Sequence, residues 1–166
     1  MKRLLLFAAA IAFSTATSAQ NIDSLERSLE KARQDAPMVL KPFVVVSRPA
    51  KYFGDYDVRP STTFSRGEKM YFYIEPKNLV NPPNSKGQYE PAFEVDLEVN
   101  SKSGESLKKP AFATFRLPGK SRVQDIFLNL TLSLDKAPAG PYTVRFLVRD
   151  LNSNKVGSVE QVVSIR

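Results

Sequence analysis

The sequence predicts an all-β fold in which two antiparallel sheets pack as a sandwich behind one short N-terminal helix. Two stretches near its end, residues 123–134 and 141–150, alternate apolar and polar side chains with a period of two, which is typical of strands with one face in a core. Upstream, further runs are separated by prolines, and helical spacing fits one segment. We interpret the two stretches as adjacent strands and the earlier runs as strands that cover the same core.

The first residues have the pattern of a bacterial signal peptide. Lys2 and Arg3 precede an apolar run that is too short to span a bilayer, and small residues favour cleavage after Ala19. We therefore expect a chain that is periplasmic or secreted after cleavage and that has no integral membrane segment in its mature form. The predicted organisation has three parts: a signal peptide (1–19), a helix (20–36) and a β-sandwich domain (37–166).

Residues 21–36 carry the helical pattern. One side of this segment is apolar at helical spacing, through Ile22, Leu25, Leu29 and Ala32. Because a short amphipathic helix is marginally stable alone in water, we expect this stripe to be covered. We favour docking on the chain's own domain or loose tethering to it, and the alternative is contact with a second copy or another protein.

Seven strands are expected after the helix. Most prolines lie between the apolar runs, where a missing backbone N–H donor does no harm. Pro42 falls inside a run, so it predicts that the first strand lies at a sheet edge. The predicted strands are residues 39–48, 68–75, 92–100, 111–117, 123–134, 142–150 and 156–165.

Two short motifs resemble those of bacterial immunoglobulin-like and fibronectin-type-III-like domains. Residues 138–144 read Pro-Ala-Gly-Pro-Tyr-Thr-Val and precede a polar turn, as in the last hairpin of such domains. Gly67-Glu68-Lys69 before an apolar run resembles the start of their second strand. The resemblance covers residues 37–166 and implies a seven-stranded antiparallel immunoglobulin-like sandwich. It also implies a hydrogen bond from Tyr142 back across the corner.

The third predicted strand presents three carboxylates on the face opposite its apolar row: Glu94, Asp96 and Glu98. Side chains two residues apart on a strand project in parallel and do not converge on one substrate atom. In an immunoglobulin-like order this strand lies beside residues 142–150, so we expect Arg145 and Arg149 to pair with the acids. We interpret the row as a solvated sheet face.

The chain has no His and no Cys. This excludes Ser-His-Asp and Cys-His nucleophile systems, and thiolate or imidazole metal sites, within the chain. We therefore expect a protein that is not an enzyme and that has no cofactor and no metal. A carboxylate-dependent hydrolase would need two acids that converge in a cleft, and the loop-end acids to inspect are Glu75, Glu90 and Asp57.

Residues 150–154 alternate oxygen donors as a calcium loop does. However, Lys155 stands where that loop needs Gly, and Gln161 stands where it needs Glu. A hairpin turn with Asn154 in a left-handed conformation explains the same residues.

A long connection over residues 51–66 is the first candidate binding surface. It opens with Tyr52, Phe53 and Tyr56, and long loops are often functional, with aromatic side chains that anchor interfaces. The alternative is that this loop folds onto the sandwich and its rings close the core.

A second candidate surface lies on the predicted sheet exterior. Outward positions of the second and fifth strands carry Tyr71, Tyr73 and Phe127. Because these strands are expected to be neighbours, the rings would form one apolar patch. Either the N-terminal helix or another protein is expected to cover it.

The expected function is an interaction or accessory module that binds a protein partner in the cell envelope. The alternative is a carbohydrate- or envelope-polymer-binding domain that uses the same rings. Loss of Lys2 and Arg3 with the leader lowers the formal net charge from +7 to +5. The basic residues over 102–122 have neither a phosphate loop nor a series of stacking aromatics beside them, so nucleic acid is not an expected partner. The sequence leaves the oligomeric state open.

Overall fold

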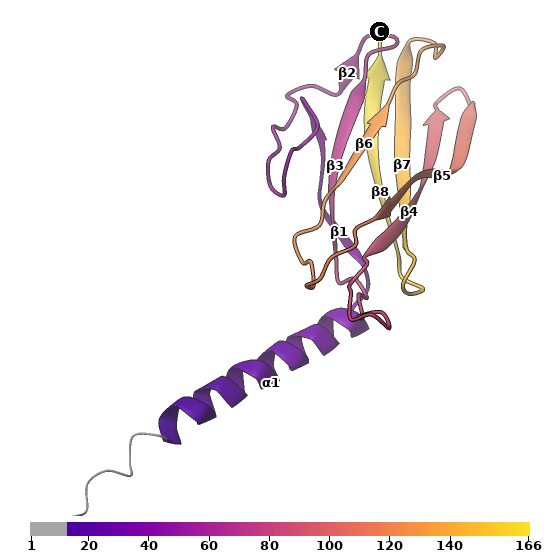
Figure 1. Ribbon diagram of the computed structural model, residues 1–166. Helices are drawn as coiled ribbons and strands as arrows, with labels where there is room; N and C mark the ends of the chain where they lie inside the picture. The colour runs from indigo at the N-terminus through magenta and orange to yellow at the C-terminus, as the bar shows by residue number, and fades with distance from the viewer. Residues whose placement is uncertain (1–12) are drawn as a thin grey trace, which may run out of the picture.

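The computed structural model describes residues 13–166 and contains one helix and two facing β-sheets. Figure 1 shows the sheets packed as a sandwich, with helix α1 (Phe13–Asp35) leaving it at one end. The smaller sheet has the strand order β1-β3-β6, and the larger sheet has the order β2-β8-β7-β4-β5. The predicted all-β sandwich is therefore confirmed. Most of the predicted signal peptide, residues 1–12, lies outside the described residues.

The described residues form eight strands, one more than the sequence predicted. The additional strand is β2 (Thr63–Phe64), which pairs in parallel with β8 (Val156–Ile165), so the larger sheet is mixed and not wholly antiparallel. A strand of two residues is too short to be recognised from an alternation of apolar and polar side chains. The other strands are β1 (Val39–Val46), β3 (Met70–Lys77), β4 (Ala92–Ser101), β5 (Ser106–Arg116), β6 (Leu128–Leu132) and β7 (Gly140–Asp150).

The core lies between the two sheets and consists of the apolar rows that the alternation predicted. Phe72 of β3 and Phe146 of β7 meet across it, with their ring centroids 5.0 Å apart. The predicted rows of β4, β6 and β7 are all buried: Phe93, Val95, Leu97, Val99, Leu128, Leu130, Leu132, Tyr142, Val144, Phe146 and Val148.

The prediction that β6 and β7 are adjacent strands is wrong. β6 pairs with β3 in the smaller sheet, whereas β7 pairs with β4 and β8 in the larger sheet. Their apolar rows therefore face each other across the core. A period of two identifies the buried face of a strand, but it does not identify the sheet to which the strand belongs.

β1 is an edge strand of the smaller sheet, as Pro42 predicted. Its pairing with β3 shifts register between Leu40 and Phe43, around a cis Lys41–Pro42 peptide. A proline without an N–H is tolerated at such an irregular edge.

The carboxylates of β4 are paired, as predicted. Arg149 donates to Glu94 at 2.7 Å and to both oxygens of Asp96 at 2.5 and 2.7 Å. These hydrogen bonds lower the pKa of the Asp96 carboxyl. Glu98 lies opposite Arg145 in the register of β4 and β7, but it forms its ion pair with Lys108 of β5, and Arg145 donates to the Ser158 hydroxyl at 3.4 Å instead. The row is a paired face of the larger sheet.

The corner before β7 also has the predicted hydrogen bond. The Tyr142 hydroxyl donates to the Pro138 carbonyl at 2.9 Å. This bond fixes the ring at the edge of the core, where Tyr142 is buried.

Helix α1 starts earlier than predicted, at Phe13, and runs through the expected cleavage position. Its C-terminal end contacts the sandwich through polar groups. Arg33 donates to the Gln124 side chain at 2.8 Å, and Glu30 forms an ion pair with Arg122. Among residues 13–166, no helix combines the length and apolarity that crossing a bilayer requires.

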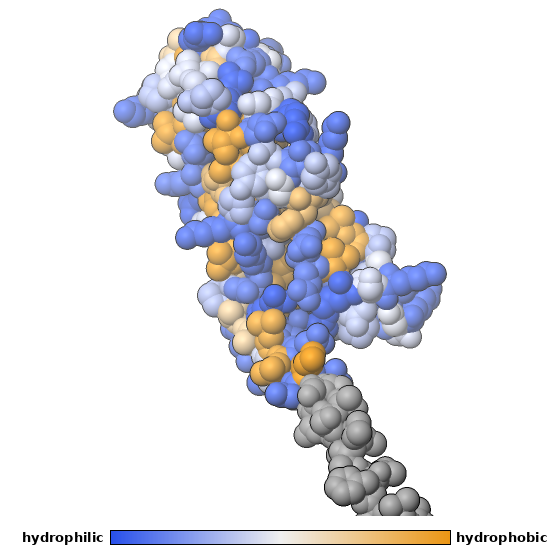
Figure 2. Space-filling view, turned by 90° about the vertical axis from the view of Figure 1, so that its left-hand side faces the viewer, coloured by the Kyte–Doolittle hydropathy of each residue, from blue (hydrophilic) through white to orange (hydrophobic). Residues whose placement is uncertain are grey.

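The apolar stripe of α1 is not covered by the sandwich. Ile22, Leu25 and Leu29 are 58%, 61% and 51% exposed, and Figure 2 shows hydrophobic side chains at the surface beside the grey segment. Of the two arrangements favoured from the sequence, docking of the stripe on the chain's own domain is therefore wrong, whereas a loosely tethered helix agrees with these exposures. The helix is attached by its last turns, which precede β1, and not by its apolar side.

Candidate binding site

The loop between β1 and β2 folds across the outer face of the smaller sheet. The Tyr56 ring packs on the Tyr73 ring with centroids 4.5 Å apart, and Tyr73 stacks on Phe127 at 5.6 Å. The Asn129 side chain donates to the Ala50 carbonyl at 2.8 Å and accepts from the Ala50 N–H at 3.1 Å. The loop is therefore joined to β6 as well as to β3.

This loop covers the aromatic patch that the sequence placed on the sheet exterior. Tyr73 is fully buried, and Tyr71 and Phe127 are half-buried against it. Helix α1 contacts the sandwich elsewhere, so the expectation that it covers the patch is wrong. Cover of the half-buried Tyr71 and Phe127 by another protein stays a prediction. The two candidate surfaces are in contact with each other, and the alternative in which the loop closes over the sandwich holds for Tyr56.

The hydroxyl of Tyr73 fastens the tip of the loop. It accepts a hydrogen bond from the Gly54 N–H at 2.8 Å and donates to the buried Glu75 carboxylate at 2.9 Å. Burial, aided by the neighbouring Glu75, raises the pKa of Tyr73 to about 12. Gly54 has φ of 78°, a conformation that favours glycine. The tip can therefore turn back towards Tyr73.

An ion pair holds the base of the loop. Arg48 donates to both carboxylate oxygens of Asp55 at 2.7 and 2.9 Å, and Asp55 also accepts from the Lys51 N–H at 3.0 Å. These hydrogen bonds, with that from Arg48 the strongest, lower the pKa of Asp55 to about 2. A bidentate pair of this kind fixes geometry as well as charge.

Two of the candidate residues remain at the surface. Tyr52 is 66% exposed and Phe53 is 38% exposed, although both lie between the anchored residues Lys51 and Gly54. The backbone on each side of the two rings is fixed, so their positions are constrained. Of the six predicted site residues, these two are presented to solvent at the tip of the loop.

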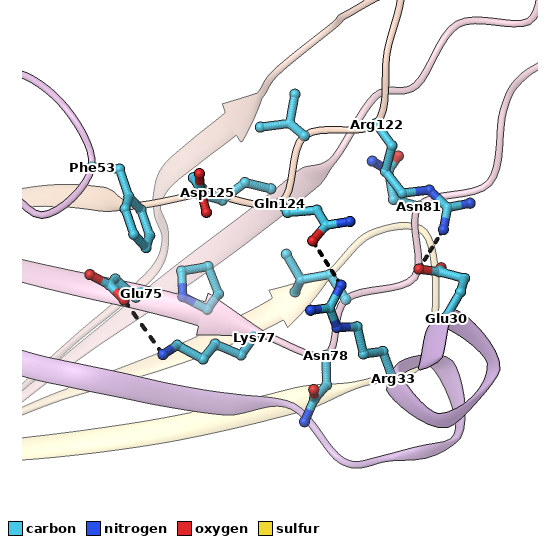
Figure 3. A pocket seen from close by; sticks show the side chains of 14 residues that line it. Glu30, Arg33, Phe53, Glu75, Lys77, Asn78, Asn81, Arg122, Gln124 and Asp125 are labelled. Atoms are coloured by element: carbon cyan, nitrogen blue, oxygen red, sulfur yellow. Dashed lines mark hydrogen bonds and ion pairs between the residues drawn. The ribbon is translucent and has the colours of Figure 1, made fainter. Parts of the chain in front are cut away.

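Phe53 forms one wall of a cleft of about 340 Å³ between the loop, the end of β3 and the last turns of α1. Figure 3 shows Phe53 and Glu75 at one end of the cleft and Glu30, Arg122 and Asn81 at the other. Its charged side chains are three acids and three bases: Glu30, Glu75, Asp125, Arg33, Lys77 and Arg122. Several of these are paired within the wall, including Glu75 with Lys77 at 3.6 Å.

Asn81 is the one buried polar side chain of this wall whose amide nitrogen and oxygen both lack a hydrogen-bond partner among the described residues. It is 5% exposed, and buried amides are normally hydrogen-bonded. The sequence did not indicate this residue. Asn81 precedes two prolines in a polar connection, where a side chain is expected to face water.

The connection that carries Asn81 is held by Asp150. This buried carboxylate accepts from the Val80 N–H at 3.1 Å, from the Asn152 N–H at 2.9 Å and from the Ser153 hydroxyl at 2.8 Å. The oxygen donors that resemble a calcium loop thus form the turn between β7 and β8, as the alternative interpretation predicted, but Asn154 does not have the left-handed conformation expected of it. Among the described residues, no group of three or more acidic side chains is placed to hold a metal ion.

Lys155 joins the same turn to α1. Its ammonium group donates to the Asn78 carbonyl at 2.7 Å and to the Arg33 carbonyl at 2.9 Å. A cation at the C-terminal end of a helix also complements the helix dipole. The turn between β7 and β8 therefore positions two walls of the cleft at once.

The three loop-end acids do not converge. Glu75 lines the cleft, but Asp57 pairs with Arg48 at 3.2 Å and Glu90 pairs with Arg116 at 3.4 Å, and neither lines the cleft. The pair of acids that a glycosidase needs is therefore not formed by these residues.

No protein-family model matches the chain, and no curated protein matches it. Among solved structures, the chain is similar to the sporulation control protein Spo0M from Bacillus subtilis, with 12% sequence identity and a TM-score of 0.39. The match covers 79% of this chain and 50% of that chain, so the chain spans about half the length of that protein. This similarity is too weak to carry an inference about function.

Proposed function

We propose that this chain is an exported, immunoglobulin-like domain that binds a protein partner, without catalysis, in the bacterial periplasm or outside the cell. The signal-peptide pattern of residues 1–19 supports export. The immunoglobulin-like assignment is supported by seven long strands in two sheets and by Tyr142. This tyrosine lies near the start of the sixth long strand and hydrogen-bonds back to the backbone four residues upstream, as in the tyrosine corner of such domains.

The pair of exposed rings beside the cleft is the observation that carries the proposal. Tyr52 and Phe53 stand on a loop tip that is fixed on both sides by hydrogen bonds. Aromatic side chains that are held in place before binding lose little conformational entropy in a complex. Such residues often dominate the binding energy of an interface.

The cleft fits a side chain or short segment of a protein partner. A volume of about 340 Å³ lies within the range of ligand-binding pockets. Its acids and bases are balanced in number, so it does not select a strongly charged group. The unpartnered amide of Asn81 in the wall has the hydrogen-bonding capacity that a peptide amide group would complement.

Binding of a carbohydrate or envelope polymer is the second candidate, and the exposure of Tyr52 favours it specifically. A ring that is two-thirds exposed has a free apolar face on which a sugar can pack, and the polar side chains of the cleft can bind hydroxyl groups.

Photo-crosslinking in living cells separates these candidates. A photoreactive amino acid at position 52 is expected to form a covalent adduct with one protein, and Phe53→Ala is expected to reduce that adduct at least tenfold. The matched control places the same amino acid at Val162, which is 53% exposed on β8, and is expected to give no such adduct. Retention on envelope polysaccharide that depends on Tyr52, without a protein adduct, would favour the second candidate. Absence of both would refute the proposal.

The export part of the proposal has its own test. Cell fractionation followed by N-terminal sequencing is expected to find a mature chain that begins at Gln20 outside the cytoplasm. An uncleaved chain in the cytoplasm would overturn it without bearing on the binding surface.

A further inference from the structure

The two sheets differ in width, and the difference leaves β5 uncovered. The larger sheet has five strands and the smaller has three. Leu107 of β5 lies directly opposite Val99 of β4, so both side chains are on the inner face of the larger sheet. Val99 is 4% exposed, whereas Leu107 is 52% exposed. The start of β5 therefore extends beyond the smaller sheet, with an apolar side chain on the uncovered inner face.

The strand that borders this gap in the smaller sheet is β6. It pairs with β3 on one side, and its other side has no backbone partner among the described residues. An unpaired strand edge presents a row of N–H and C=O groups that can pair with another strand.

The edge of β6 differs from the other three sheet edges. Proteins protect free edges with prolines, lysines, irregular pairing or very short strands. β1 has Pro42 and a shifted register, β2 has two residues, and β5 has two lysines and Pro110 with a shifted register. β6 reads Leu-Asn-Leu-Thr-Leu and has none of these features.

A groove of about 430 Å³ lies between the start of β5 and the segment that follows β6. It offers room for the side chains of an added strand. The apolar residues that line it are Val99, Leu107, Leu134, Ala137, Pro138 and Tyr142.

We propose that β6 accepts a single extended segment of a partner protein as an additional antiparallel strand. Backbone hydrogen bonds to β6 hold the segment, and its apolar side chains at alternate positions pack on Leu107 and into the groove. This surface is separate from the aromatic loop and does not depend on the function proposed above.

The shape of the gap excludes a second intact copy of the sandwich as the occupant. Pairing of β6 with β6 of another copy would bring the larger sheets of both copies into the same space, because β5 already extends under that position. A single added strand, with no second sheet packed behind it, fits in the gap beside β6. The proposed occupant is therefore one extended peptide whose apolar side chains at alternate positions face Leu107 and the apolar part of the groove.

The test appends such a strand to the chain itself. Figure 1 shows the C-terminus at the end of the sandwich where β6 ends, so a tail that starts there can run antiparallel to β6. The full chain is extended by a Gly-Ser linker of about 10 residues and by an alternating Thr-Val segment of about 7 residues, near the usual strand length. The control tail has the same length and consists of Gly and Ser alone.

The Thr-Val tail is expected to raise the melting temperature by about 4 °C or more above the control tail. It is also expected to slow hydrogen exchange at the amides of β6. Leu107→Glu is expected to leave the stability of the untailed chain nearly unchanged, because Leu107 is half exposed, and to remove most of the gain from the tail. A tail that gives no gain, or that protects β1 or β5 instead of β6, would overturn the proposal.

If the tailed chain does not fold, binding of the strand as a separate peptide can be measured instead. The same Thr-Val peptide, labelled with a fluorophore, is titrated with the unmodified chain and with Leu107→Glu. We expect binding that the substitution weakens at least fivefold. Equal binding to both chains, or none to either, refutes the proposal, as does sedimentation that shows dimerisation through β6.

Discussion

Phe72 and Tyr73 are neighbours in β3, and both are fully buried, yet different parts of the chain cover them. Phe72 points inward and packs against Phe146 of the larger sheet. Tyr73 points outward and is covered by a loop, through Tyr56 and the Gly54 N–H. One face of the smaller sheet is thus closed by a second sheet, and the other by a segment that connects two strands.

The two faces of the smaller sheet are expected to become exposed by different processes, global unfolding for the inner face and local opening for the outer face. The inner face is covered by strands that the whole fold requires, so it opens when the domain unfolds. The outer face is covered by one loop held by an ion pair, a phenol and a few rings, so it can open locally. The same loop carries the exposed pair Tyr52 and Phe53, and the stability of that cover therefore determines how firmly the binding surface is held.

The largest expected effect is on the inner face. Phe72→Ala removes a ring from the centre of the core, so we expect it to lower the free energy of unfolding by about 3–5 kcal/mol. Urea denaturation followed by circular dichroism measures this. A loss below about 1 kcal/mol would show that the inner face is not the packed core described.

The next effect is on the outer face. Tyr73→Phe keeps the ring but removes the oxygen that accepts from the Gly54 N–H and donates to the buried Glu75 carboxylate. We expect a loss of about 1–3 kcal/mol, together with faster hydrogen exchange at Gly54 while β4 and β7 stay protected. Slower or unchanged exchange at Gly54 would contradict the closed loop. Tyr142→Phe is a matched control that should leave Gly54 unaffected.

The pH dependence of the loop should distinguish the two faces further. Because the folded pKa of Asp55 is about 2 and its ordinary value is 3.8, its stabilising contribution is complete above about pH 4 and is lost as the pH falls towards 2. We expect the protection factor of Gly54 to fall over this range while that of Val144 in β7 changes less. In the Asp55→Asn variant, the protection factor of Gly54 should not fall over this pH range. A fall of the same size in the variant would mean that another titrating group causes it.

The smallest effect on stability is expected at the tip of the loop. Tyr52→Ala and Phe53→Ala remove exposed rings, so each should change the free energy of unfolding by less than about 0.5 kcal/mol. Thermal denaturation of the two variants tests this. A loss above about 2 kcal/mol in either would mean that these rings belong to the core and are not free for binding.

Alternation along the strands was enough to predict the buried rows and the pairing of Arg149 with the acids of β4, because both follow from which face a side chain occupies. It could not show that β6 and β7 belong to different sheets, since each row is buried either way. It also could not show what covers Tyr73, because loop placement depends on contacts between residues distant in sequence. Asn81 carried no signal for the same reason, since its segment is held by Asp150, which lies 70 residues away from Val80 in the sequence.

Site-resolved hydroxyl-radical footprinting of the tyrosines measures whether the loop covers the outer face of the smaller sheet and leaves Tyr52 at its tip exposed. We expect Tyr52 to be modified at least tenfold faster than Tyr73 in the folded chain, and the two to react at similar rates after denaturation. Similar rates in the folded chain would mean that the loop does not cover the sheet, and the binding surface inferred from it would be lost.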